Sequence, residues 1–87
     1  MGEVSRVKAV VEVLARALTD RPDDVRVTEA LHKNTTLVEL YVGAGELGKV
    51  IGKQGRTAAA LRTLVATAGE CEGKTVTLEI RDTPFKG

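Results

Sequence analysis

Apolar residues recur at alternating spacings of three and four in the first part of the chain, which predicts an amphipathic helix from about residue 3 to residue 19. Its apolar stripe consists of Val4, Val7, Val11, Leu14 and Leu18. The segment 20–23 should end the helix, because Pro22 disfavours continuation and aspartate favours turns. The chain is therefore expected to open with a helix that buries one face.

Strict alternation of apolar and polar residues follows this helix and predicts β-strands. Residues 25–31 and 38–42 form two such segments, and the turn at 33–35 favours a hairpin, because Asn34 tolerates left-handed backbone geometry. A third strand is expected at 75–81. Its inward face would consist of Val76, Leu78 and Ile80.

Two helices are predicted between the second and third strands. The first, at 46–51, has room for only about one and a half turns, and the second runs from about 56 to 68, where Gly69 is a plausible stop. One face of the longer helix carries Ala58, Leu61, Leu64, Val65 and Ala68. The order α-β-β-α-α-β predicts an α+β two-layer domain, with a three-stranded sheet and the helices packed on one face.

The turn between these two helices is the most informative feature of the sequence. It consists of Gly52, Lys53, Gln54 and Gly55. Two glycines at this spacing permit positive φ angles and leave no Cβ in the way, so backbone N–H groups can converge on a phosphate oxygen. Lys53 adds a mobile positive charge, and a helix that starts near Gly55 directs its N-terminal partial charge at the same point. The turn therefore predicts an anion-binding site.

The distribution of charge supports this prediction better than its total does. The formal net charge is only +1, which argues against a strongly basic nucleic-acid-binding chain. No acidic residue, however, lies between Glu46 and Glu70. The cations in this interval are Lys49, Lys53, Arg56 and Arg62. We expect positive potential to be concentrated around the glycine turn.

Length and composition limit the remaining possibilities. A chain of 87 residues is expected to be one small domain, at 1–82, with a short tail at 83–87. The apolar runs are far shorter than the ~20 residues of a membrane span, and the N-terminus lacks the apolar core of a signal peptide. Cys71 has no partner for an internal disulfide, which fits a reducing compartment. The sequence therefore predicts a cytoplasmic protein that does not associate with membranes.

Catalytic and metal-binding chemistry has little support in the sequence. His32 is the only histidine and lies at the edge of a turn, while the segment 70–72 is an acidic loop rather than a defensible ligand set. Residues 43–48 fit the pattern G-x-G-x-x-G but lack the parallel β-α-β context of a dinucleotide site, and Val50 stands where a P-loop needs Ser or Thr. We expect no enzyme activity, metal, cofactor or small-molecule substrate.

The apolar pair before the turn, the G-x-x-G motif and the apolar Leu61 resemble the core of the KH (K homology) RNA-binding domain. The segment 48–56, with the opening helix and the order of elements, looks like the KhpA family of small bacterial proteins with a single type II KH domain. The resemblance covers roughly residues 3–82. It implies binding of single-stranded RNA, with the glycine turn holding the backbone of about four nucleotides.

The resemblance also implies roles for residues beside the turn, which would itself be the backbone clamp. Val50 and Ile51 would supply part of an apolar groove floor, although a core position explains one of the two at least as well. Lys49 and Arg56 would contact neighbouring phosphates, and Arg62 is a weaker candidate.

Two further features concern the far side of the groove and the partners. Lys33 and Asn34, in the hairpin turn, are weak candidates for its far edge. Tyr41 and Phe85 are the only aromatic residues, so base stacking can contribute little, and both are candidates for a protein contact.

The family implies a homodimer or a complex with a KhpB-type KH protein, and roles as an RNA chaperone or post-transcriptional regulator linked to cell length. The alternative is a KH-fold interaction module with weak or no RNA binding.

Overall fold

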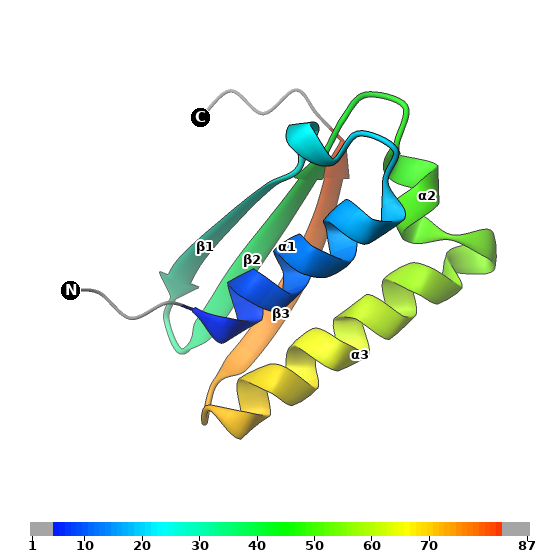
Figure 1. Cartoon of the computed structure of the whole chain (residues 1–87). Coiled ribbons are helices and arrows are strands. Elements are labelled where there is room, and N and C mark those ends of the chain that lie inside the picture. The colour runs from blue at the N-terminus through cyan, green and yellow to red at the C-terminus, as the bar shows by residue number, and fades with distance from the viewer. Residues whose placement is uncertain (1–4, 83–87) are drawn as a thin grey trace.

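Three strands form one mixed sheet, and two helices pack side by side against one of its faces (Figure 1). The computed structural model describes residues 5–82, so Val4 and the tail 83–87 with Phe85 lie outside the described residues. The elements are α1 (Arg6–Leu18), the 3-10 turn η1 (Pro22–Asp24), β1 (Arg26–His32), β2 (Thr35–Val42), α2 (Leu47–Ile51), the 3-10 turn η2 (Lys53–Gly55), α3 (Arg56–Cys71) and β3 (Thr75–Asp82). The expected α+β two-layer architecture and its order of elements are confirmed.

The strands lie in the order β1-β2-β3. β1 and β2 are antiparallel, whereas β2 and β3 are parallel, with Thr35 opposite Thr75 and Val42 opposite Asp82. Parallel neighbours need a crossover connection, which here consists of α2, the glycine turn and α3. The candidate site therefore lies in the segment that joins the two parallel strands.

The first helix buries a narrower stripe than its periodicity predicted. Its buried residues lie four positions apart and are Val7, Val11 and Ala15. Leu14 is only partly buried, and Leu18 is 38% exposed, so the predicted inward position of Leu18 is wrong. Leu18 lies on the same face, since 11 residues place it only about 20° from Val7 around the helix axis, but it is the last residue of the helix.

The third helix continues past the predicted stop at Gly69 and ends at Cys71. Gly69 is buried in the last turns, where an added Cβ would lie 2.5 Å from Val76 Cγ2 and 3.1 Å from the Lys74 carbonyl oxygen. Its role is thus close packing against the start of β3, and the left-handed residue after the helix is Gly73, with φ 71°.

Alternation of apolar and polar residues predicted burial in the strands more accurately than periodicity did in the helices. Val38, Leu40 and Val42 of the central strand are fully buried, and Leu78 of β3 is buried as well. In the β1–β2 turn the residue with positive φ is Lys33 (φ 59°) rather than the expected Asn34. On the long helix, Leu64 is 50% exposed, contrary to prediction, because it lies at the edge of the face occupied by Leu61 and Val65.

Candidate nucleic-acid interface

The turn between α2 and α3 has the backbone conformation that its glycines favour. Gly52 has φ 77° and ψ 175°, and Gly55 has φ 72°. Gln54 also adopts a left-handed conformation, with φ 57° and ψ 26°. The combination at Gly52 is open almost exclusively to glycine. Lys53 and Gln54 therefore form the tip of a bend that is fixed by a glycine on each side.

Close packing adds a second requirement for glycine at one of the two positions. A Cβ added to Gly52 would overlap the hydroxyl oxygen of Thr57 and lie 2.6 Å from the Thr57 Cβ. A Cβ added to Gly55 would meet nothing within 4 Å. Gly52 therefore serves both conformation and close approach to the first turn of α3, whereas Gly55 serves conformation alone.

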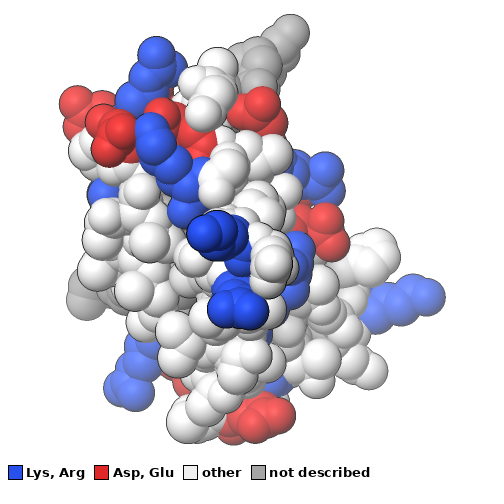
Figure 2. Space-filling view, turned by 90° about the vertical axis from the view of Figure 1, so that its right-hand side faces the viewer, with Lys and Arg blue, Asp and Glu red and all other residues white. Residues whose placement is uncertain are grey.

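The tip of the turn carries positive charge that the protein does not neutralise. Lys53, Gln54 and Arg56 are exposed, and no side-chain hydrogen bond or ion pair was found for them within residues 5–82. The first turn of α3 contains no acidic residue, so the partial positive charge at its N-terminus is available to a ligand. Figure 2 faces this side of the molecule and shows Lys and Arg side chains gathered down its middle.

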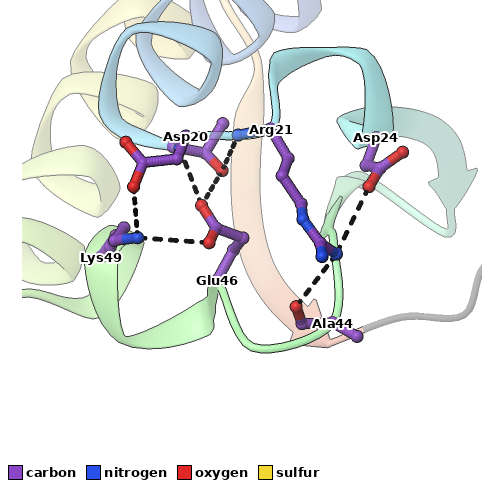
Figure 3. A network of polar contacts seen from close by, with 7 residues as sticks. Asp20, Arg21, Asp24, Ala44, Glu46 and Lys49 are labelled. Atoms are coloured by element: carbon purple, nitrogen blue, oxygen red, sulfur yellow. Dashed lines mark hydrogen bonds and ion pairs between the residues drawn. The ribbon is translucent and has the colours of Figure 1, made fainter.

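Lys49, which was predicted to flank the turn, is engaged by carboxylates (Figure 3). Its Nζ lies 2.6 Å from Asp20 Oδ2 and 3.2 Å from Glu46 Oε2. These hydrogen bonds, the one to Asp20 above all, raise the pKa of Lys49. The side chain is 46% exposed, so the ammonium group is accessible to solvent but already paired.

Glu46 forms the buried centre of this network, with its side chain only 9% exposed. Its Oε1 accepts hydrogen bonds from the Thr19 hydroxyl at 2.5 Å and from the Asp20 N–H at 2.7 Å, and its Oε2 accepts one from Lys49. The bonds from Thr19 and Asp20 are the main reason that the pKa of Glu46 falls from 4.5 to about 2, although burial opposes them. Glu46 is therefore an ionised link between the end of α1 and the start of α2.

A second contact fastens the loop between β2 and α2. The Arg21 guanidinium donates to the Ala44 carbonyl oxygen at 3.3 Å and lies 3.8 Å from Asp24 Oδ2 (Figure 3). Gly43 packs against the same group, since an added Cβ would lie 2.8 Å from Asp24 Oδ2. The segment 43–48, which fits a nucleotide-binding pattern, is thus held by the protein's own side chains.

The apolar pair before the turn divides into one core residue and one surface residue. Val50 has no exposed surface and belongs to the hydrophobic core, whereas Ile51 is only partly buried. Only Ile51 therefore presents apolar surface beside the turn, and Val50 lies beneath it. Arg62 is exposed farther along α3, again without an ion pair among the described residues.

Other residues considered from the sequence lie apart from this site. Lys33 and Asn34 are at the opposite end of β2 from α2 (Figure 1). Tyr41 is partly buried in the central strand. His32 and Cys71 are exposed, and residues 5–82 contain no group of three His, Cys, Asp or Glu side chains placed to hold a metal. In the same range no helix has both the length and the apolarity needed to cross a membrane.

Three residues that shape the site were not identified from the sequence. They are Thr19, Glu46 and Thr57. The spacing of Glu46 and Lys49 on one helical turn was a local signal of their ion pair. The bond from Thr19 to Glu46 had no such signal, because it joins residues 27 positions apart.

Comparisons with known proteins place the chain in a family. The sequence model described as "KhpA/KhpB, KH domain" matches residues 8–80. The chain is 52% identical over 77 residues to the RNA-binding protein KhpA of Aquifex aeolicus, covering 88% of this chain and 98% of that protein. It is 47% identical over 74 residues to the RNA-binding protein KhpA of Clostridium perfringens, covering 85% of this chain and 99% of the relative.

A third relative gives a similar match. The chain is 48% identical over 73 residues to the RNA-binding protein KhpA of Mycobacterium tuberculosis, covering 84% of this chain and 88% of that protein. The names of these relatives describe a binding protein and not an enzyme. With a match across most of its length to the family and to these relatives, the chain belongs to the KhpA/KhpB family of KH-domain proteins.

Proposed function

We propose that this protein binds single-stranded RNA and that the turn 52–55 holds the sugar-phosphate backbone. Its KhpA relatives are named RNA-binding proteins, and the family match includes the turn. The observation that carries the proposal is an exposed glycine turn whose neighbouring cations, Lys53 and Arg56, have no anionic partner within the described residues. We further propose that the protein acts in the cytoplasm as an RNA chaperone or post-transcriptional regulator.

Each part of the site has a separate task in this proposal. The bend presents its tip, Lys53 and Gln54, to a phosphate, while the N–H groups of Gly52 and Gly55 donate to the carbonyls of Gly48 and Gly52 and hold the bend in shape. The start of α3 adds its partial positive charge. Lys53 supplies a mobile cation, while Arg56 offers a planar group that suits phosphate oxygens. Ile51 gives a small apolar contact for a base. Val50, buried in the core, holds the turn in place from beneath.

Affinity should be modest and sensitive to salt. With only Tyr41 and Phe85 as aromatic residues, base stacking adds little, so most of the binding free energy must come from phosphate contacts. If two or three phosphates are neutralised, the logarithm of the association constant should fall with the logarithm of salt concentration at a slope of roughly −1.4 to −2. A slope near zero would contradict a phosphate-based mode.

The decisive experiment reverses the charge at the tip of the turn. The double variant Lys53→Asp with Gln54→Asp keeps both glycines, so the fold is retained while the local potential changes sign. We expect its affinity for a fluorescein-labelled oligouridylate, measured by fluorescence anisotropy, to drop at least about tenfold at low salt.

A matched control makes the same chemical change at another exposed turn. The double variant Lys33→Asp with Asn34→Asp alters the charge equally at the β1–β2 turn, at the far end of β2, where aspartate also tolerates the left-handed conformation of Lys33. It should bind RNA almost as wild type does. Equal affinity of both variants and wild type, with intact far-UV circular dichroism, would rule out the turn as the binding site.

A second function is favoured by apolar side chains on the outer sides of the two long helices. Val13 of α1 is 66% exposed and Leu64 of α3 is 50% exposed, and these helices pack side by side. We propose that this surface pairs with a second copy of the chain or with a KhpB-type KH protein. The double variant Val13→Asp with Leu64→Asp should lower the mass measured by sedimentation velocity; a dimer that persists would place the contact elsewhere.

A further inference from the structure

The four cations predicted around the glycine turn are not equivalent. Lys53, Arg56 and Arg62 have no side-chain partner among the residues that the structure describes, whereas Lys49 is held by two carboxylates. A phosphate oxygen would have to compete for Lys49 but not for the other three. The number of phosphates that the site can neutralise therefore depends on how firmly Lys49 is held.

The two carboxylates hold Lys49 in different ways. Glu46 is nearly buried and is fixed by two other donors, the Thr19 hydroxyl and the Asp20 N–H. The Asp20 side chain is 76% exposed, and within residues 5–82 it forms a hydrogen bond and ion pair with Lys49 alone. Solvent-exposed ion pairs of this kind shift an equilibrium by at most about fivefold. Asp20 is therefore the partner that a stronger or more numerous anion can displace.

The position of Lys49 makes such an exchange geometrically simple. Lys49 lies one helical turn before Gly52, so it stands on the side of α2 from which the glycine turn departs. Its flexible four-carbon stem allows the ammonium group to swing while Glu46 stays in place. Figure 2 shows acidic side chains gathered at the upper end of the same face, next to the run of Lys and Arg.

We propose that Asp20 sets the RNA affinity of this site by occupying Lys49 in the free protein. Its carboxylate takes the place of a phosphate on the Lys49 ammonium group, and a bound RNA strand exchanges with it. Asp20 is thus a positioning residue that acts through Lys49. The inference rests on the proposed RNA-binding function, which it deepens by naming a residue that competes with one of the phosphate contacts.

Removing the carboxylate tests this exchange. Asp20→Ala keeps the backbone N–H that binds Glu46, so the rest of the network remains. With a labelled single-stranded oligouridylate, we expect binding roughly two- to fivefold tighter than wild type at low salt, and a salt slope steeper by up to about 0.7, because no freed Asp20 carboxylate takes up a cation when a phosphate binds Lys49. The slope separates the proposal from a purely structural effect, which would not add a counterion.

Two controls isolate the role of Lys49. Asp23→Ala removes the same charge from a nearby exposed position that has no ion pair among residues 5–82, and it measures the general effect of charge. In a Lys49→Met background, Asp20→Ala should give no more than that general gain. Asp20→Asn provides a second variant if the alanine variant is less stable.

The outcomes separate this inference from the proposed function. An equal gain from Asp20→Ala and Asp23→Ala, no gain, or a gain that persists without Lys49 would overturn the role of Asp20. If the Lys53→Asp with Gln54→Asp variant loses RNA binding in the same assay, the proposed function stands even so. If that double variant binds as wild type does, the function fails and this inference fails with it.

Discussion

Two glycine-containing segments flank the short helix α2, and the protein treats them differently. The loop before α2 is fastened by Arg21, which donates to Ala44, and by Glu46, which accepts hydrogen bonds from the end of α1. The turn after α2 has no such fastening, because the side chains of its tip residues Lys53 and Gln54 make no hydrogen bond or ion pair with the described part of the chain. The polar side chains of the loop before α2 are therefore paired within the protein, whereas those at the tip of the turn after α2 remain accessible to a ligand.

Glycine spacing alone therefore does not identify a phosphate site. Both segments combine glycines with the start of a helix, and the first even fits the pattern of a dinucleotide-binding loop. What separates them is the residue at the N-cap. In α2 this is the acidic Glu46, whose carboxylate binds Thr19, Asp20 and Lys49, whereas in α3 it is Gly55, which carries no charge. An anion from outside is favoured only at the second.

The largest expected effect comes from the glycine that the second segment cannot replace. Gly52→Ala should lower the free energy of unfolding by about 2–5 kcal/mol, since it combines a strained backbone with overlap against Thr57. Urea unfolding followed by circular dichroism measures the change. Gly48→Ala is the control, because an added Cβ meets nothing within 4 Å inside α2, and it should stabilise the protein by up to about 1 kcal/mol. Equal stability of the two variants would mean that the turn is not built as described.

A second prediction uses cations on either side of α2. Lys53→Met and Arg56→Met should each weaken RNA binding by roughly three- to tenfold and reduce the salt slope by about 0.7. Arg21→Met, in the fastened loop, should leave affinity nearly unchanged because its guanidinium is engaged with Ala44 and Asp24. Anisotropy titrations at several salt concentrations measure both quantities. A loss at Arg21 as large as at Lys53 would erase the distinction between the loops.

The contribution of the fastened loop to folding stability should depend on pH, because it contains Glu46. Because folding lowers the pKa of Glu46 from 4.5 to about 2, its ionised form stabilises the protein fully above pH 4.5, and this contribution is lost as the pH falls toward about 2. In Glu46→Gln that part of the pH dependence should disappear. Urea midpoints measured between neutral pH and pH 2 test the prediction, and parallel curves for the two proteins would contradict it.

Smaller losses of stability than at Gly52 are expected at the other glycines of the fastened loop. Gly45 has φ 83° with open space around an added Cβ, so Gly45→Ala should cost only about 1–2 kcal/mol of strain, and Gly45→Asn less. Gly43→Ala should cost about 1 kcal/mol or less, because its Cβ would meet the movable ends of Asp24 and Arg21. Thermal unfolding followed by circular dichroism ranks these variants. A larger loss at Gly43 than at Gly52 would reverse the assignment.

Local patterns predicted the fold and the conformation of the open turn. Alternation identified the buried residues of β2, and the G-x-x-G spacing indicated the positive φ angles of Gly52 and Gly55, because both signals depend on residues close in the sequence. Periodicity was less exact on the helices. It defines a face but neither which edge of that face is covered nor where along the helix the cover ends, so Leu64, at an edge, and Leu18, at the helix end, were wrongly placed inside.

Features that depend on distant parts of the chain could not be predicted in this way. The bond between Thr19 and Glu46, the pairing of Lys49 with Asp20 and the contact of Gly69 with Val76 arise only when separate elements meet. Two of them changed an expectation: Lys49 proved to be paired, and Gly69 proved to be a packing residue rather than a stop. Their roles follow from tertiary positions rather than from residue type.

The parallel pairing of β2 with β3 has a consequence for synthesis on the ribosome. The segment that bears the glycine turn is also the connection between these strands, so its two ends are brought into register only when Thr75 and its successors pair with β2. Contacts of such high sequence separation form late, after the intervening chain has been ordered. A nascent polypeptide that still lacks its last strand would thus lack the pairing that fixes the two ends of this segment, so we expect the proposed RNA site to be complete only after β3 has been synthesised.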